Sequence, residues 1–433
     1  MDGYTIYIYT EKPTESFLYT ANHICNNIMG CGCVVTTERS GNHGIDINYS
    51  ANDIPGALAV RPNGLFDNPL AYAQAASPIG TWRGLPTMFH DGQGDLGFDL
   101  FAAVFFSLSR LEEYGSTALD SHGRYLPTAS VAHRAGFLQR PIVDEWCAQL
   151  RSILMERNTQ ATFLPPRMRS IVTIDVDHPF KYRHKGFLLP LLGAARDIAR
   201  GNTAQLCERL AVLAGMTGDP FWSFDYILRQ VGTRMQDTKF FILRGKRGRY
   251  DKRYLGQSRK YDSLITRLAE RCEVGIHPSY RSSFDADGIM AETRELEALT
   301  RRPVTSCRFH FLRVRMPETY AMLARLGFTD DYSLAYSPAT GFRAGTAVPF
   351  KFFDIGSDRV TSLTVHPTCA MDVTMKNALH LSPAEAVARL HDLRAKVAAT
   401  GGEFTTLFHN SSLGNDCEWR GWRTVFESTL DGK

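Results

Sequence analysis

The segment Ile171–Phe180, "IVTIDVDHPF", decides the fold and raises the chemical question. Its first five residues form an apolar, β-branched pattern that predicts a buried strand ending at Asp175. A second carboxylate, Asp177, and a histidine, His178, follow directly. Charged groups at the end of a buried strand cost free energy unless they are paired or bind a cation. The segment therefore predicts a functional group of side chains at this strand end.

Strand and helix patterns alternate downstream of this segment. The predicted strands span residues 238–245, 272–279, 305–311 and 403–410, and the predicted helices span 261–271, 290–300, 317–328 and 382–402. The last helix has a clear start signal, because Ser382 can cap it and Glu385 can complete a capping box. Repeated strand–helix units predict a parallel sheet covered by helices, either open or closed into a barrel.

The upstream part has a different pattern. Strands are predicted at 4–10, 32–38 and 44–50, and helices at 99–114 and 143–156. The polar stretch 158–170 contains a Pro–Pro pair and directly precedes the opening strand, which is typical of a domain boundary. We expect a smaller α+β domain over residues 1–165 and an α/β domain over residues 166–433.

Composition excludes several classes of protein. The 433 residues are 44% apolar and 22% charged, as in globular proteins, and a net charge of +4 is too small to indicate nucleic-acid binding. The start of the sequence has no signal-peptide pattern, and the apolar segment 99–114 is too short to span a bilayer. We expect a soluble, cytoplasmic protein without a membrane span; its oligomeric state is open.

The nine cysteines favour reduced thiols over a zinc knuckle. Cys25, Cys31 and Cys33 lie close together, but no second Cys or His pair follows them at zinc-binding spacing. Buried or idle thiols in a reducing compartment are the preferred interpretation.

Polar residues with a shared chemistry lie at four predicted strand ends. In parallel α/β folds the site forms at the carboxyl ends of the strands. These ends carry Asp175 and Asp177, then His277, then Arg308 and His310, and finally His409. Asp175 and Asp177 lie on the same face of their strand, so their charges repel unless a cation lies between them. Carboxylate and imidazole ligands suit Zn²⁺, which would make a bound water molecule acidic.

Each of these residues also has a structural interpretation. The two aspartates can cap the next segment or pair with Lys181 and Arg183, and Arg308 can form a structural salt bridge. His277, His310 and His409 can each satisfy a nearby backbone group. The functional interpretation is favoured because four independent structural explanations would otherwise have to coincide.

From Ser170 to about Trp422 the chain resembles the polysaccharide deacetylases of carbohydrate esterase family four, the NodB-homology superfamily. The motifs are "TIDVD", "GIHPSY", "CRFHF", "FTDDYS" and "LFHN", in that order. The resemblance implies a distorted (β/α) barrel, and removal of N- or O-acetyl groups from a carbohydrate with a divalent metal, zinc by preference.

The resemblance also implies a role for each motif residue. Asp175 matches the general base and His409 the general acid, whereas Asp177 and His277 match metal ligands. Arg308 matches the arginine that orients the base, and Asp330 or Asp331 its acidic partner, with Asp331 preferred.

One departure from the family pattern decides how the ligand set is interpreted. Arg281 stands where the family has its second metal-binding histidine, and a guanidinium, which stays protonated, cannot replace an imidazole as a ligand. His310 or His178 can complete the site, and His310 is preferred. The alternative is a catalytically inactive protein that binds carbohydrate or acts as a scaffold in polysaccharide synthesis.

Further residues are candidates for substrate contact. Arg249, Tyr250 and Arg343 can contact a polar or anionic sugar, and Tyr280 and Trp422 can provide stacking surfaces. A solvated loop or a packing aromatic is an equally good interpretation of each.

Overall fold

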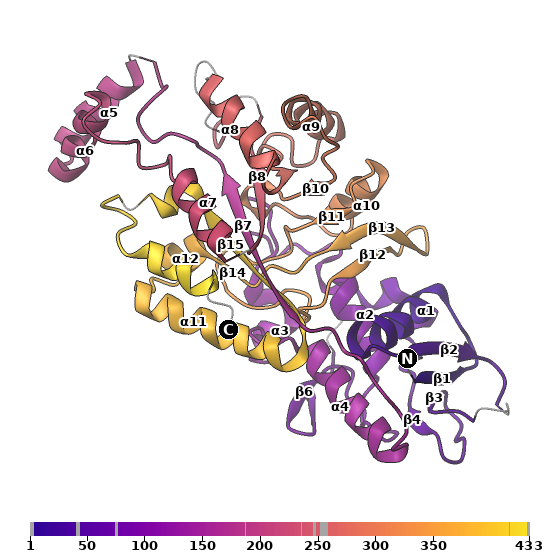
Figure 1. Ribbon diagram of the computed structural model, residues 1–433. Helices are drawn as coiled ribbons and strands as arrows, with labels where there is room; N and C mark the ends of the chain where they lie inside the picture. The colour runs from indigo at the N-terminus through magenta and orange to yellow at the C-terminus, as the bar shows by residue number, and fades with distance from the viewer. Residues whose placement is uncertain are drawn as a thin grey trace.

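The computed structural model describes residues 4–39, 44–73, 77–186, 188–234, 236–245, 248–251, 259–414 and 416–430. Two sheets organise these residues. A four-stranded sheet comes from the start of the chain, and a nine-stranded sheet from the remainder (Figure 1).

The first sheet has the strand order β2-β1-β3-β4. Its strands are β1 (Thr5–Thr10), β2 (Gly32–Thr36), β3 (Ile47–Tyr49) and β4 (Leu58–Val60). All three pairings are parallel. Parallel pairing is typical of α/β units, so the expected α+β character of this part is wrong in that respect. A short antiparallel hairpin, β5 (Gly80–Trp82) and β6 (Leu85–Thr87), follows.

The helices of this first part are α1 (Glu15–Asn22), α2 (Leu100–Ser109), α3 (Val131–Arg134) and α4 (Ile142–Arg157). Every residue of α2 is buried, which explains why its sequence is apolar on all sides. The predicted helices at 99–114 and 143–156 are thus confirmed near their expected bounds.

The nine-stranded sheet has the order β12-β13-β11-β10-β9-β8-β7-β15-β14 and curls into an open half-barrel (Figure 1). Its strands are β7 (Met168–Val176), β8 (Asp237–Ile242), β9 (Glu273–Ile276), β10 (Ser306–Cys307), β11 (Asp330–Asp331), β12 (Phe350–Asp354), β13 (Arg359–Val365), β14 (Ala370–Met371) and β15 (Gly402–His409). All pairings are parallel except that of β12 with β13. The expected parallel sheet within a mixed α/β fold is therefore confirmed.

Helices follow the strands of this part of the chain, and all but the first two lie along the sheet (Figure 1). They are α5 (Leu188–Ala199), α6 (Thr203–Leu213), α7 (Phe224–Thr233), α8 (Arg259–Ala269), α9 (Ala286–Thr300), α10 (Glu318–Arg325), α11 (Pro383–Thr400) and α12 (Trp422–Leu430). The predicted capping box of α11 is present, with Ser382 and Glu385 bonded reciprocally. Among the described residues, no helix combines the length and the apolar character needed to cross a membrane.

The hydrophobic core is continuous between the two sheets. One cluster of buried side chains includes Ile8 and Phe101 from the first part and Ile174 and Phe353 from the second. The strands of the two sheets separate at the expected seam, but because the core crosses it, the domain division at 165/166 stays a prediction.

A buried ionic network links the two parts of the chain. Glu113 accepts hydrogen bonds from Arg110 Nε (2.8 Å) and from Arg343 Nε (2.9 Å), and Arg110 also binds Glu112. Burial raises the pKa of Glu113, but the two guanidinium groups outweigh it and hold the pKa below its usual value. Arg343, a candidate sugar contact, is therefore a buried structural residue.

Replacing Glu113 with Gln should destabilise the protein by about 3–5 kcal/mol, because Arg343 would keep a buried charge without a carboxylate partner. Urea unfolding followed by circular dichroism measures this change. Asp67→Asn, which removes the exposed pair with Lys12, is the matched control and should leave the midpoint unchanged. Equal midpoints for both variants would contradict the role of this network.

Candidate metal centre

The parallel sheet brings four strand ends to one edge. Asp175 lies opposite His409 in the register of β7 and β15, and Cys307 lies opposite Ile276 in that of β10 and β9. The residues that follow these strand ends, Asp177, His277 and Arg308, therefore meet at the same edge.

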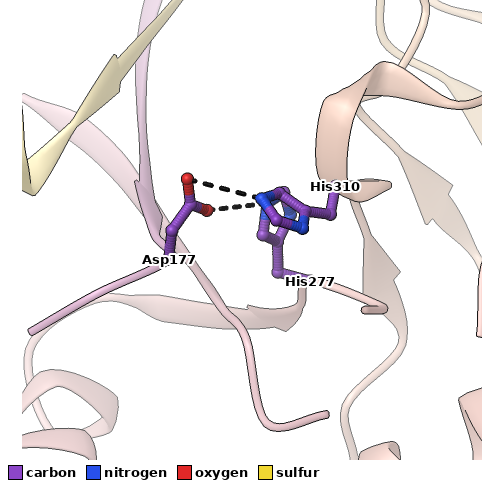
Figure 2. A group of neighbouring side chains, drawn as sticks. All are labelled: Asp177, His277 and His310. Atoms are coloured by element: carbon purple, nitrogen blue, oxygen red, sulfur yellow. Dashed lines mark ion pairs between the residues drawn. The ribbon is translucent and has the colours of Figure 1, made fainter. Parts of the chain in front are cut away.

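Three of the predicted side chains form a compact group of ligand atoms. Asp177 Oδ1 lies 3.1 Å from His277 Nε2, and Asp177 Oδ2 lies 3.6 Å from His310 Nε2 (Figure 2). One ligand atom from each residue lies within 4.8 Å of the other two, a spacing at which all three can hold one ion. Asp177 Oδ1 and His277 Nε2 are buried and make no hydrogen bond, although they face each other. Two buried polar atoms that face each other without a hydrogen bond are the arrangement expected where both bind the same cation.

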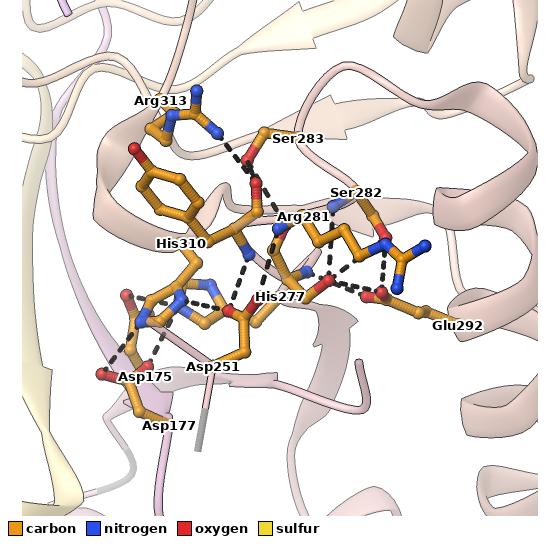
Figure 3. A network of polar contacts seen from close by, with 12 residues as sticks. Asp175, Asp177, Asp251, His277, Arg281, Ser282, Ser283, Glu292, His310 and Arg313 are labelled. Carbon is orange, nitrogen blue, oxygen red and sulfur yellow. Dashed lines mark hydrogen bonds and ion pairs between the residues drawn. The ribbon is translucent and has the colours of Figure 1, made fainter. Parts of the chain in front are cut away.

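Outer hydrogen bonds fix both histidines with Nε2 towards this group. His277 Nδ1 lies 2.6 Å from the carbonyl oxygen of Arg308, and His310 Nδ1 lies 3.1 Å from Asp251 Oδ1. Asp251 is itself held by the backbone N–H groups of Tyr280 and Arg281 (Figure 3). Metal-binding histidines characteristically make this kind of outer bond to a carbonyl or carboxylate.

The exposed Arg281 side chain is not part of the ligand group. A 3₁₀ turn, His310–Leu312, instead brings His310 into the group from beyond β10. His178, the other candidate, lies outside the group and lines a neighbouring cavity with Lys181. The backbone carbonyl of His178 accepts a hydrogen bond from Asn410.

The charges of the group are strongly coupled. Burial raises the pKa of Asp177, but the charge of His310 and the close contacts with both histidine rings outweigh it and hold the pKa well below its usual value. Burial lowers the pKa of His310, but Asp177 and Asp251 outweigh it and raise the pKa to about 9. The site is thus built to keep a carboxylate ionised inside the protein, as a cation site requires.

Asp175 and Arg308 lie directly behind the ligand group. Asp175 Oδ2 is 3.8 Å from His277 Nε2, and Asp175 Oδ1 is 3.8 Å from Arg308 Nε. Arg308 is fully buried, lies over the ring of Phe241 and donates to Thr368 Oγ1 (3.2 Å). Burial lowers the pKa of Arg308. Asp175 Oδ1 makes no hydrogen bond, so this oxygen can accept a proton from a molecule bound at the site.

Asp331 does not form the expected ion pair with Arg308. Its carboxylate accepts hydrogen bonds from the backbone and hydroxyl of Ser333 (2.9 and 2.7 Å), and Ser333 Oγ in turn accepts from the Phe309 N–H. Among the described residues, the ion pair of Arg308 is with Asp175. Asp330 pairs with His366 instead. Asp331 therefore supports the backbone beside Arg308 and acts on the guanidinium through its charge, without a direct ion pair.

His409 has a carboxylate partner that sequence reasoning missed. His409 Nδ1 lies 2.8 Å from Asp372 Oδ1, and its Nε2 lies 3.8 Å from Asp177 Oδ2. The fully buried Asp372 also accepts from the backbone N–H of His409 (2.7 Å). Burial lowers the pKa of His409, but Asp372 and the site aspartates outweigh it and raise the pKa to about 10. The raised pKa keeps the His409 ring protonated near neutral pH, with Nε2 towards Asp177.

An aromatic cluster lies next to His310, one of the three candidate ligands. The ring centroids of Tyr250 and Tyr280 are 4.4 Å apart, and those of Tyr280 and Phe311 are 5.4 Å apart. His122, from the first part of the chain, contributes its ring and contacts the Tyr280 hydroxyl (3.2 Å). Trp422 is buried and packs against Trp419, so it provides no stacking surface.

Comparisons with known proteins give partial matches. A family model described as "Family of unknown function (DUF7033)" matches residues 6–159. The search of curated proteins returned no match.

Three solved structures are similar over 61% of this chain. A Mycobacterium smegmatis protein classed as a polysaccharide deacetylase has 16% identity, a TM-score of 0.39 and 83% of its own length covered. The polysaccharide deacetylase Bc1974 from Bacillus cereus has 11% identity, a TM-score of 0.31 and 87% covered. A Pseudomonas aeruginosa protein classed likewise has 10% identity, a TM-score of 0.35 and 83% covered. With TM-scores below 0.5, these likenesses establish neither the fold nor the activity of this chain.

Replacing Asp251 with Asn should weaken zinc binding by about 10–100-fold, because the outer carboxylate of His310 would be lost. Competition titration with a chromogenic chelator measures the affinity. Asp262→Asn is the control. Asp262 lies on α8 and pairs with Arg244, so its replacement should leave the zinc affinity unchanged. Unaltered binding in Asp251→Asn would contradict the role of this carboxylate in supporting His310.

Proposed function

We propose that the protein is a metal-dependent hydrolase that removes acetyl groups from a saccharide or a saccharide precursor. The group Asp177–His277–His310, with Asp175 and His409 beside it, is the observation that carries the proposal. One carboxylate and two imidazoles form the kind of three-residue ligand set that leaves a position open for chemistry. We further propose that the curled sheet and its helices form a distorted (β/α) barrel of the deacetylase type.

The ligand set suits zinc. Nε2 of both histidines is directed inwards by an outer hydrogen bond on Nδ1, and the carboxylate of Asp177 supplies oxygen. An ion held there would acidify a water molecule and polarise the acetyl carbonyl.

The remaining polar residues supply proton transfer and orientation. Asp175, whose Oδ1 lacks a hydrogen bond, accepts the proton of the attacking water. Arg308, whose Nε lies 3.8 Å from Asp175 Oδ1, holds this carboxylate in place. His409 gives its Nε2 proton to the departing amine or alkoxide, and Asp372 fixes its ring through Nδ1.

The aromatic cluster supports a saccharide substrate. Tyr250, Tyr280 and Phe311 offer ring surface next to His310, whose own ring lies 4.7 Å from that of Phe311. Pyranose rings stack on such apolar faces while their hydroxyls contact polar neighbours. The sequence motifs that resemble the polysaccharide deacetylases agree with this substrate class.

The His310→Ala variant should lose stoichiometric zinc, whereas His178→Ala should retain it. Protein purified without chelator and analysed by elemental analysis tests this difference. Zinc retained in His310→Ala would contradict the ligand assignment. Absence of any metal from the unaltered protein would favour the inactive carbohydrate-binding alternative.

The Asp175→Asn and His409→Ala variants should each lower kcat on an acetylated saccharide by about 10²-fold or more, because each removes a proton-transfer group. Acetate release from a panel of N- and O-acetylated sugars is the measurement. His366→Ala is the control, since His366 pairs with Asp330 and Glu403 away from the metal group. A variant with both Asp175 and His409 altered that still turns over substrate would refute the proposed roles.

A further inference from the structure

Helices α5 and α6 form a hairpin whose buried side chains are an ion pair, Asp197 and Arg209, and a single apolar residue, Val212. The two helices lie side by side and project from the body of the molecule (Figure 1). Asp197 of α5 and Arg209 of α6 are both buried and form an ion pair, with 2.7 Å between Arg209 Nη2 and Asp197 Oδ2. The guanidinium also packs over Gly193, where an added Cβ would lie only 2.4 Å from Arg209 Nη1.

Most of the large apolar side chains of the hairpin are exposed, although Val212 is buried. Eight of the sixteen exposed large apolar side chains among the described residues lie between positions 188 and 216. On α5 these are Leu188, Leu189, Leu191, Leu192 and Ile198, and Leu188 is 67% exposed. A surface helix of a globular protein normally turns its apolar side to the core and its charges to water. This hairpin does the reverse, so its leucine face is built to be covered.

The charge of the segment indicates what covers it. Residues 181–218 contain six Lys or Arg and two acidic residues, which gives a net charge of +4, equal to that of the whole chain. Both acidic residues are already paired, Asp197 with Arg209 and Glu208 with Lys181. Arg196 and Arg200 are exposed on or next to the outer side of α5. A second copy of the chain would bring two such positive segments together and repel, whereas an anionic surface would attract them.

We propose that the α5–α6 hairpin docks onto an anionic lipid surface, with its leucines in the acyl boundary and its cations at the headgroups. An apolar helix face flanked by Lys and Arg is typical of helices that lie in the membrane interface without crossing it. The proposal stands apart from the proposed function, because lipid docking requires neither a metal nor catalysis.

The hairpin also borders a cavity that reaches the residue next to the candidate ligand Asp177. A cavity of about 640 Å³ is lined by Leu189 and Leu192 of α5, by Lys181 and Arg249, and by His178, which directly follows Asp177. Docking would therefore hold this cavity beside the lipid headgroups.

Co-sedimentation of the full chain with vesicles tests the proposal. The protein should bind vesicles of phosphatidylcholine with phosphatidylglycerol and bind pure phosphatidylcholine much more weakly. Leu188→Asp with Leu192→Asp should lower binding at least about tenfold, because two membrane-inserted side chains are lost. Arg196→Gln with Arg200→Gln should lower it roughly 25-fold, since each cation near an anionic surface contributes about fivefold.

Leu70→Asp with Leu164→Asp is the matched control, because both leucines are exposed outside the hairpin. This variant should bind vesicles like the unaltered chain, and circular dichroism confirms that every variant is folded. Absence of binding, equal binding to neutral vesicles, or equal binding by the hairpin variants would overturn the proposal. A dimer in light scattering that the Leu188→Asp and Leu192→Asp changes dissociate, without vesicle binding, would instead assign the face to a second copy.

Discussion

The parallel pairing of β7 with β15 on one side and β8 on the other is the constraint on which the site depends. It places Asp175 directly beside His409 and brings Asp177 to the edge where β9 and β10 deliver His277 and Arg308. Burying these charges together is costly, and the protein offsets the cost by giving each one an opposite partner at short range. The positions of the site residues thus follow from the strand register, and the pairing of their charges follows from their burial.

The outer hydrogen bonds decide what the site can do. Arg308 contributes its carbonyl oxygen to His277, Asp251 its carboxylate to His310, and Asp372 its carboxylate to His409. Each bond occupies Nδ1 and leaves Nε2 directed inwards. Two of these histidines face Asp177 as the proposed ligands, whereas His409 lies at the more open side as the proposed acid. The same outer hydrogen bond at Nδ1 thus serves both proposed roles.

Much of the fold could be predicted from sequence because its signals are local. The β-branched run before Asp175 and the capping box at Ser382 are contained within a few residues, and both are present in the structure. The hairpin of α5 and α6 could not be predicted, since its buried side chains include the ion pair of Asp197 and Arg209 while most of its leucines are exposed. Periodicity arguments assume the opposite arrangement.

The site could be predicted at its strand ends but not in its outer contacts. The chemistry of Asp177, His277 and His310 is visible in their positions after strands, and the structure brings all three together. Asp251 and Asp372 act through long-range contacts that no spacing encodes, although Asp372 follows a short apolar stretch that could have marked it. Asp331 acts on Arg308 through its charge alone, because Ser333, two residues further on, provides the hydrogen bonds to its carboxylate. The most direct test is a crystal structure of the zinc-loaded protein with anomalous data at the zinc edge. The account predicts a single peak about 2.0–2.2 Å from Asp177, His277 Nε2 and His310 Nε2; a peak at His178 in place of His310, or at Cys25, Cys31 and Cys33, would contradict it.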